Sequence, residues 1–265
     1  MAGLNTSTTL TVVIPTLNEA TTLPLLLADL ALWPHPLDVL VVDAGSCDAT
    51  AMVAQQAGAD VLNSPERGRG QQLRFGTQQA RGTWLLVLHA DSRLDPRWPQ
   101  KVFAAMHALN GAQRVWHFDF RVDDRRPMLR LLEWAVHLRS CLRQRPYGDQ
   151  GLLIHRQQLA AVGGYRPLPL MEDLDLIERI IRNSHLCRLG VPLTTSGRRW
   201  RRNGVIRLAI QNAQLKRRWV RGEDPAVLER DYMNQSKRVE SISSHTKTHS
   251  DDLEVPVANP VADKN

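Results

Sequence analysis

The sequence predicts an α/β protein with a doubly wound, mostly parallel sheet flanked by helices. Three short apolar runs, at residues 10–15, 39–42 and 84–88, are typical of strands buried on both faces. Helical patterns follow them after short loops, and repeated βα units favour right-handed crossovers. Because ligands bind beyond the carboxyl ends of parallel strands, we expect the acids that follow these runs to share one crevice. These acids are Glu19, Asp43 and Asp91.

The other elements are predicted from caps, breakers and periodicity. In the first half, Thr21 or Thr22 is placed to cap one helix and Ser46 or Asp48 to cap another. The elements predicted there are helices over residues 23–32, 52–57 and 71–80, a short strand over 59–62, and a helix that opens at Asp95-Pro96. The second half is less regular. It is expected to hold strands over 115–122 and 152–154, and helices over 127–142, 171–182, 205–220 and 225–233, with one more ending at Gly163-Gly164.

We divide the chain into a domain over residues 9–222, a C-terminal helix over 223–235 and a disordered tail over 236–265, which is polar and lacks periodicity. No apolar stretch reaches the roughly 20 residues of a membrane span. The start of the chain has no signal-peptide pattern, and three scattered cysteines suit a reducing compartment, so we expect a cytoplasmic protein. The net charge of +7 allows a nucleic acid, an anionic membrane or a phosphorylated ligand as partner.

Two loops suit a nucleotide. Asp43 can accept hydrogen bonds from a base or ribose, while Gly45 lets the backbone approach a ligand; the alternative is a simple turn with a capping acid. Residues 67–70 place glycines beside arginines at a helix start, which suits phosphate, although a flexible basic loop is the alternative. Neither a Walker sequence nor a dinucleotide fingerprint is present.

Two further groups of acids suit metal binding and proton transfer. Asp91, beside the phosphates, is placed to hold Mg²⁺ or Mn²⁺, or alternatively to cap the next helix. For His89, packing or hydrogen bonding is favoured slightly over metal ligation. Glu172 and Asp173 begin a helix, where either a general base or simply exposed acids would fit. The same holds for Asp149, for which stabilising the turn between Gly148 and Gly151 is the alternative.

Together and in order, these pieces resemble the family 2 glycosyltransferases, which have the GT-A fold, over about residues 9 to 222. Further motifs at residues 147–151 and 196–200 look like a small soluble bacterial subgroup of that family. The matching family motifs are Ile14-Pro15-Thr16-Leu17-Asn18-Glu19, Asp43-Ala44-Gly45-Ser46-Cys47-Asp48, Arg67-Gly68-Arg69-Gly70, His89-Ala90-Asp91-Ser92 and Glu172-Asp173.

The resemblance implies an enzyme, hexosyltransferase-like, that moves a sugar from a nucleotide-diphosphate donor to an acceptor hydroxyl with inversion, assisted by Mg²⁺ or Mn²⁺. Asp173 would be the general base with Glu172 as its neighbour, and Asp149 and Gln150 would lie at the acceptor. Asp91 would coordinate the metal. The donor would be bound by Pro15, Thr16, Asn18, Glu19, Asp43, Ser46, Arg67, Gly70, Arg198 and Arg199.

One residue departs from the family pattern. The usual metal motif is Asp-x-Asp, and His89 stands at its first position. Asp91 would then hold the metal with the phosphates and water, or with His89 as a second ligand, and strict metal dependence is in question.

The acceptor is not specified by the sequence. A basic amphipathic helix over residues 205–220 could lie on an anionic bilayer, which would suit a lipid-linked acceptor and contact with the inner face of the membrane. The alternative, which we favour, is a core-packing helix with a solvated basic face. A nucleic-acid partner is not expected, because aromatic and basic residues are not interleaved.

Two other functions remain open. A sugar nucleotidyltransferase would normally carry a glycine-rich basic loop after the first strand, where residues 15–19 offer none. A non-catalytic sugar-nucleotide-binding protein is compatible with the replaced metal acid.

Overall fold

The computed structural model describes residues 9–143 and 148–234, with the side chains of 139–143, 199, 202 and 203 left aside. The predicted tail over 236–265 lies outside the described residues, as does residue 235 of the predicted C-terminal helix. Residues 225–234 are helical, as predicted.

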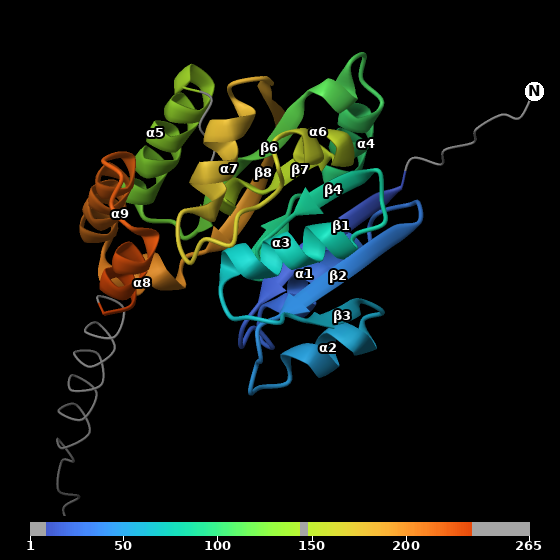
Figure 1. Ribbon diagram of the computed structural model, residues 1–265, viewed down its shortest axis with the longest axis horizontal. Helices are drawn as coiled ribbons and strands as arrows, with labels where there is room; N and C mark the ends of the chain where they lie inside the picture. Colours follow the sequence, from blue (N-terminus) through green and yellow to red (C-terminus); the bar gives the residue numbers. More distant parts are fainter. Residues whose placement is uncertain (1–8, 144–147, 235–265) are drawn as a thin grey trace, which may run out of the picture.

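A mixed eight-stranded sheet forms the centre of the molecule (Figure 1). Its order is β3-β2-β1-β4-β7-β6-β8-β5, and β3, β2, β1 and β4 run parallel to one another. β7 pairs antiparallel with both β4 and β6, whereas β6 and β8 are parallel and β5 is antiparallel to β8. The strands are β1 (Leu10–Thr16), β2 (Leu37–Asp43), β3 (Asp60–Asn63), β4 (Trp84–Val87), β5 (Ser92–Leu94), β6 (Val115–Asp123), β7 (Leu152–His155) and β8 (Leu186–Ser196).

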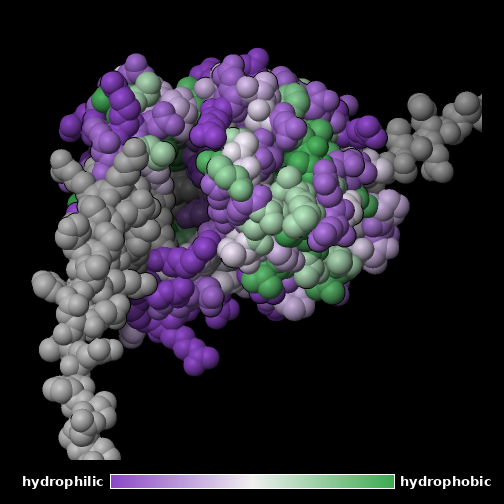
Figure 2. Space-filling model, turned by 90° about the horizontal axis from the view of Figure 1, so that it is seen from below, coloured by the Kyte–Doolittle hydropathy of each residue, from purple (hydrophilic) through white to green (hydrophobic). Residues whose placement is uncertain are grey.

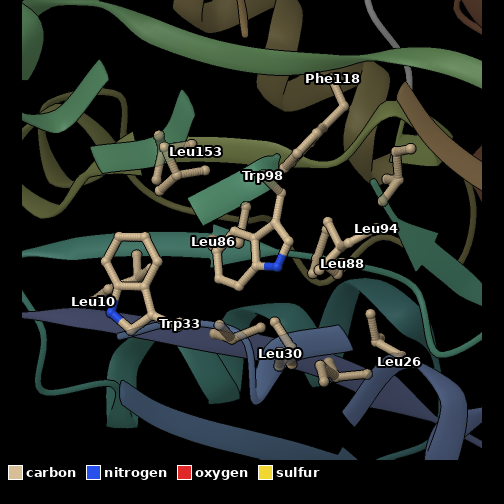
Figure 3. Packing of buried hydrophobic residues seen from close by; sticks show 14 of the residues in the cluster. Leu10, Leu26, Leu30, Trp33, Leu86, Leu88, Leu94, Trp98, Phe118 and Leu153 are labelled. Atoms are coloured by element: carbon tan, nitrogen blue, oxygen red, sulfur yellow. The ribbon is translucent and has the colours of Figure 1, made fainter. Parts of the chain in front are cut away.

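One face of the sheet is covered by α1 (Leu23–Leu30), α2 (Thr50–Gln56) and α4 (Trp98–Met106). Figure 3 shows the centre of this layer, where leucines from strands and helices surround two tryptophans. The rings of Trp33 and Trp98 stack with centroids 5.2 Å apart. The buried indole N–H of Trp98 donates to the backbone oxygen of Asp29 at 3.0 Å, so this large side chain is buried without an unpaired donor.

The opposite face is covered by α3 (Arg69–Gln79), α6 (Arg156–Ala161) and α7 (Glu172–Ile180). Gly76 brings α3 directly onto the sheet, because a Cβ there would lie 2.6 Å from the side chain of Val42. One turn earlier, the buried Gln72 amide donates to the backbone oxygens of Thr16 and Val42, at 2.8 and 2.7 Å. The start of α3 is therefore fixed at the carboxyl ends of β1 and β2.

A third, smaller core lies at one end of the molecule, where α5 (Pro127–Arg143), α8 (Arg198–Asn203) and α9 (Val205–Val220) gather (Figure 1). It joins the outer half of β6 to these helices, and its buried members are Phe120, Val122, Leu129, Val136 and Val205. On the face seen in Figure 2, hydrophobic patches interrupt a mainly hydrophilic surface. Within the described residues, no helix is both long and apolar enough to cross a membrane.

The predicted fold class is confirmed, and most predicted elements form within a few residues of their expected bounds. β8, which the sequence analysis did not predict, is the largest difference. Its eleven residues include Gly190 with a φ of +73° and Pro192, and the pairing of β6 with β8 shifts register between His117 and Asp119. Because these residues interrupt both an apolar run and a two-residue alternation, the strand carries no clear periodic signal.

Candidate active site

The carboxylate of Asp43, at the end of β2, organises the loop that follows it. Its Oδ1 accepts from the hydroxyls of Thr16 and Ser46, at 3.0 and 2.5 Å. Its Oδ2 accepts from the backbone N–H groups of Gly45 and Ser46, at 3.0 and 2.8 Å. Burial alone would raise the pKa of Asp43, but these four hydrogen bonds outweigh it and hold the pKa below its ordinary value. The acid is therefore ionised and firmly placed.

The loops after β1 and β2 are joined into one rim. Asn18 adopts a positive φ of 57°, its N–H donates to the Ser46 hydroxyl at 2.8 Å, and its Oδ1 accepts from the N–H of Cys47 at 2.8 Å. Arg67 extends over this rim, because a Cβ on Gly45 would lie 3.7 Å from its Nη2. The structure thus brings five of the expected donor-binding residues together, namely Thr16, Asn18, Asp43, Ser46 and Arg67.

Two other expected donor-binding residues are packed within the fold. Pro15 is buried in β1, beyond the last β1–β4 pair of Val13 and Val87, so its missing N–H removes no bond from that ladder. Gly70 is buried at the start of α3, where a Cβ would lie 2.3 Å from the backbone oxygen of Leu168. Its small size lets the segment that leads into α7 lie directly on α3.

A second group contains Glu19, Asp91 and Arg198. Glu19 follows β1, and Asp91 lies half-buried in the turn after β4. Burial is the main cause that raises the pKa of Glu19, and the Asp91 carboxylate raises it further. Arg198, the first residue of α8, also lies beside Glu19, with its Nη2 3.8 Å from Oε2 of that residue. The side chain of Arg199 is outside the described part of the chain.

A third group forms where α3 meets α7. Nε of Arg69 donates to the carboxylate of Glu172, which is 1% exposed, and Nη2 of Arg69 lies 3.9 Å from Oδ2 of Asp173. Burial would lower the pKa of Arg69, but the two carboxylates outweigh it and raise the pKa above its ordinary value. Burial is also the main cause that raises the pKa of Glu172, and the charge of Arg69 opposes that rise.

Asp173 is held by backbone donors on both oxygens. The N–H of Gly148 donates to Oδ2 at 2.7 Å, and the N–H of Leu174 donates to Oδ1 at 2.8 Å. Gly148 belongs to the short turn η2 (Gly148–Gln150), which closes over this group. The Asp173 side chain is 18% exposed, so its carboxylate is both oriented and accessible.

His89 connects the second and third groups. Its Nε2 lies 3.4 Å from Nη1 of Arg69 and would lie 3.2 Å from a Cβ on Gly148. Burial and the charge of Arg69 lower the pKa of His89 to about 3, although Asp173 opposes this, so the ring is neutral at ordinary pH. These groups form a row that runs from Glu19 through Asp91, His89 and Arg69 to Asp173.

The acceptor residues predicted from the sequence lie in η2. Gln150 is 1% exposed, and its amide donates to the backbone oxygen of Phe118 at 3.2 Å. This contact holds η2 against β6, and the acceptor role of Gln150 stays a prediction. Asp149 is half-buried beside it.

Sequence reasoning missed two residues of this site, Arg69 and Gly148. Both lie inside motifs that the sequence analysis singled out, at residues 67–70 and 147–151. The pairing of Arg69 with two acids more than 100 positions away has no local signal, because it depends on how α3 and α7 pack. The need for glycine at position 148 follows only from the nearby carboxylate.

Comparison with solved structures supports the fold. S. aureus TarS, residues 1–349 in complex with UDP, superposes with a TM-score of 0.57 at 16% identity, over 71% of this chain and 60% of that chain. Glucosyl-3-phosphoglycerate synthase from Mycobacterium tuberculosis, in complex with Mn²⁺, UDP-glucose and phosphoglyceric acid, gives a TM-score of 0.53 at 22% identity, over 70% of this chain and 71% of that chain. At these identities the likeness concerns the fold, and the expected GT-A fold is confirmed.

Comparison of sequences gives the family. An uncharacterized glycosyltransferase of Mycobacterium tuberculosis is 40% identical over 85 residues, which cover 32% of this chain. The matched part of the chain spans 38% of the length of that relative, and an uncharacterized glycosyltransferase of Mycobacterium bovis matches to the same extent. Residues 11–158 match the family described as Glycosyl transferase family 2. Because this match covers more than half of the chain, the protein belongs to glycosyl transferase family 2.

Proposed function

We propose that this protein transfers a hexosyl group from a nucleoside diphosphate donor to an acceptor hydroxyl, with inversion at the anomeric carbon. The observation that carries the proposal is the continuous row of groups from the Asp43 loop through Asp91 to Asp173. A nucleotide-binding rim, a carboxylate suited to a cation and an oriented, accessible base lie in that order. Displacement of a diphosphate by a hydroxyl can use all three groups.

Asp173 is the proposed general base. As the acceptor oxygen bonds to the anomeric carbon and the bond from that carbon to the diphosphate breaks, the hydroxyl proton passes to the Asp173 carboxylate. Hydrogen bonds from Gly148 and Leu174 fix the carboxylate, and its partial exposure leaves it open to an acceptor. Glu172 is buried against Arg69, so its proposed role is to position that guanidinium.

The nucleoside is proposed to bind at the rim formed by the loops after β1 and β2. The chain's own donors already hold the Asp43 carboxylate, so Asp43 acts mainly by fixing the loop shape that the base and ribose meet. Arg67, over Gly45, is placed to contact the ribose or phosphates. UDP bound to TarS and UDP-glucose bound to the mycobacterial synthase support a uracil donor.

The residues at the end of β4 fit a divalent cation shared with the diphosphate. Asp91 offers a hard oxygen ligand, and its repulsion with Glu19 would fall if a cation lay nearby. Among the described residues, no group of three or more His, Cys, Asp and Glu could hold a metal, so phosphate and water oxygens would complete the ligands. Bound Mg²⁺ or Mn²⁺ would neutralise charge on the leaving diphosphate.

His89 fits the role of a second metal ligand poorly. Its Nε2 faces the Arg69 guanidinium, whose positive charge would oppose a bound cation. We propose that His89 instead separates Arg69 from Asp91 as a neutral group. Arg198, beside Glu19, is placed to meet negative charge on the leaving diphosphate with its fork of donors.

A donor screen tests this proposal. UDP- and GDP-sugars are incubated with the protein and Mn²⁺, and nucleotide release is measured, with water as the acceptor where no other is supplied. Asp173→Asn should bind UDP normally but lose about 10²–10⁴-fold in the rate of release. Glu178→Gln, further along α7, is the matched control and should keep the rate. Donor binding without any turnover would identify a non-catalytic binder, and an active Asp173→Asn would refute the base.

A further inference from the structure

α5 carries apolar side chains on two opposite faces. Leu129 and Val136 point into the small core against β6. The other face is exposed, with spacings of three, three and four residues that place its members in one stripe opposite the core. Its exposed members are Met128 at 47%, Leu131 at 65%, Trp134 at 61% and Leu138 at 40%. Helices with apolar residues on both sides normally have a partner on each side.

α9 has a second exposed face, which combines apolar and basic residues. Val205, Leu208 and Leu215 are its buried residues. Ile206 and Ile210 are 59% and 52% exposed, and their spacing of four residues places them on the same side of the helix. The same side continues, by helical periodicity, to the exposed Arg217 and Arg221.

The segment that forms α8 and α9 carries charge of one sign. Residues 198–221 include nine Lys and Arg and no Asp or Glu. Arg218 is paired with Glu223 and Asp231, whereas Arg217 and Arg221 point away on the exposed side. α5 and α9 share one core, so both exposed faces belong to the same end of the protein (Figure 1). We define Leu131, Trp134, Ile206, Ile210, Arg217 and Arg221 as the α5–α9 surface.

We propose that the α5–α9 surface docks on an anionic phospholipid bilayer. Leucine, isoleucine and tryptophan side chains enter the boundary between headgroups and acyl chains, and the arginines contact lipid phosphates. A second copy of the chain suits this surface less well, because a twofold contact would place one basic face against another. A nucleic acid would meet the arginines but would leave the aliphatic side chains in water.

Docking would also place the candidate active site near the lipid surface. α8 begins at Arg198, whose guanidinium lies 3.8 Å from Glu19, and only Gly204 separates α8 from α9. An acceptor presented at a bilayer would therefore lie close to the edge of the site. The bilayer contact is independent of the transfer reaction, since it concerns binding alone.

Vesicle flotation with the full-length protein tests the proposal. Vesicles contain equal parts of phosphatidylglycerol and phosphatidylcholine, or phosphatidylcholine alone. The wild-type protein should float with the first and much less with the second, and high salt should release it. Two double variants should each weaken binding at least about ten-fold. One combines Leu131→Ser with Trp134→Ser, and the other combines Arg217→Gln with Arg221→Gln.

Matched controls use exposed residues at the other end of the molecule. One control combines Leu32→Ser with Leu109→Ser and removes a similar apolar area, and the other combines Arg81→Gln with Lys101→Gln and removes the same charge. Both controls should leave flotation unchanged. Equal losses in the control and surface variants would overturn the proposal, as would a wild-type protein that ignores anionic vesicles. If the wild-type protein is a dimer that dissociates in the Leu131→Ser, Trp134→Ser variant, the surface would be assigned to a second copy. If the wild-type protein binds an RNA duplex and the arginine variant does not, the surface would be assigned to nucleic acid.

Discussion

Arg69, at the start of α3, donates a hydrogen bond to Glu172, at the start of α7, across 103 positions of sequence. The same guanidinium approaches Asp173, with 3.9 Å between Nη2 and Oδ2. One cation thus joins two helix N-termini and lies beside the proposed base. Because Glu172 is 1% exposed, its charge depends on this partner.

Replacing Arg69 should destabilise the fold as well as the site. Arg69→Met leaves a buried carboxylate without its cation, which should lower the free energy of unfolding by about 3 kcal/mol. This is the low end for a buried pair, since the Arg69 side chain is 38% exposed. The melting temperature should fall by about 6–12 °C. Adding Glu172→Gln removes the unpaired charge and should restore part of the loss, and no recovery in the double variant would contradict the ion-pair explanation.

Gly148→Ala should impair transfer with little effect on stability. The added Cβ would lie 2.9 Å from Oδ2 of Asp173 and 3.2 Å from Nε2 of His89. The Asp173 carboxylate is the end of a flexible side chain, so it can move away at small cost, and the base would leave its position. We expect at least a ten-fold loss in the rate of nucleotide release, because small displacements of reacting groups are costly. Gly163→Ala is an unsuitable control, since that glycine has a φ of +78°.

A better control for position 148 is Ala160→Gly in α6, an exposed site remote from the row of acids. It changes one methyl group without approaching Asp173, and its cost is only the modest helix penalty of glycine, about 1 kcal/mol. An unchanged release rate in Gly148→Ala would show that Asp173 does not need its present position.

The strands at the centre of the sheet were predictable, whereas pairings between distant elements were not. β1, β2 and β4 lie between other strands and beneath helices, so most of their side chains are apolar and each strand contains a recognisable apolar run. The carboxylates after them were placed for the same reason, since parallel strands end at one edge. β8, by contrast, contains Gly190 and Pro192, and its pairing with β6 depends on tertiary contacts.

The site divides in a similar way. The Asp43 loop was recognisable because its hydrogen-bonding residues are local in sequence. Sequence alone could not show that Gln150 would be buried against Phe118, or that Nε2 of His89 would face Arg69. Burial and partner choice for single polar residues arise from packing, on which periodicity carries no information.

Asp43→Asn should destabilise the protein in a pH-dependent way. The four hydrogen bonds to the carboxylate lower its folded-state pKa, so the stability that they supply is present above the unfolded-state pKa of about 3.9. It is lost as the pH falls through the folded-state pKa. The amide substitution should cost about 1–3 kcal/mol at pH 5–7, where the difference from wild type is constant.

Denaturant unfolding at pH 7, 5, 4 and 3 measures that difference, which should shrink below about pH 4 as the wild-type carboxylate takes up a proton. Asp60→Asn, at an exposed position on β3, is the control and should show little cost at any pH. A difference between Asp43→Asn and wild type that stays constant down to pH 3 would show that the Asp43 charge is not stabilising.

Nucleoside diphosphate and divalent cation should stabilise the protein jointly. The phosphates would bring negative charge beside Asp91 and Glu19, and only a cation makes that approach favourable. UDP with Mn²⁺ or Mg²⁺ should therefore raise the melting temperature, and UDP with chelator should do so much less. At a ligand concentration near 100 times Kd, the stabilisation is about 2.7 kcal/mol, which corresponds to a rise of several degrees in the melting temperature for a domain of this size.

Asp91→Ala should abolish the metal-dependent part of the shift, whereas Asp43→Ala should weaken UDP binding with or without metal. Because Asp91 is the proposed protein ligand for the metal, an undiminished metal effect in Asp91→Ala would place the cation elsewhere, and no shift with any nucleoside diphosphate would refute the donor site itself.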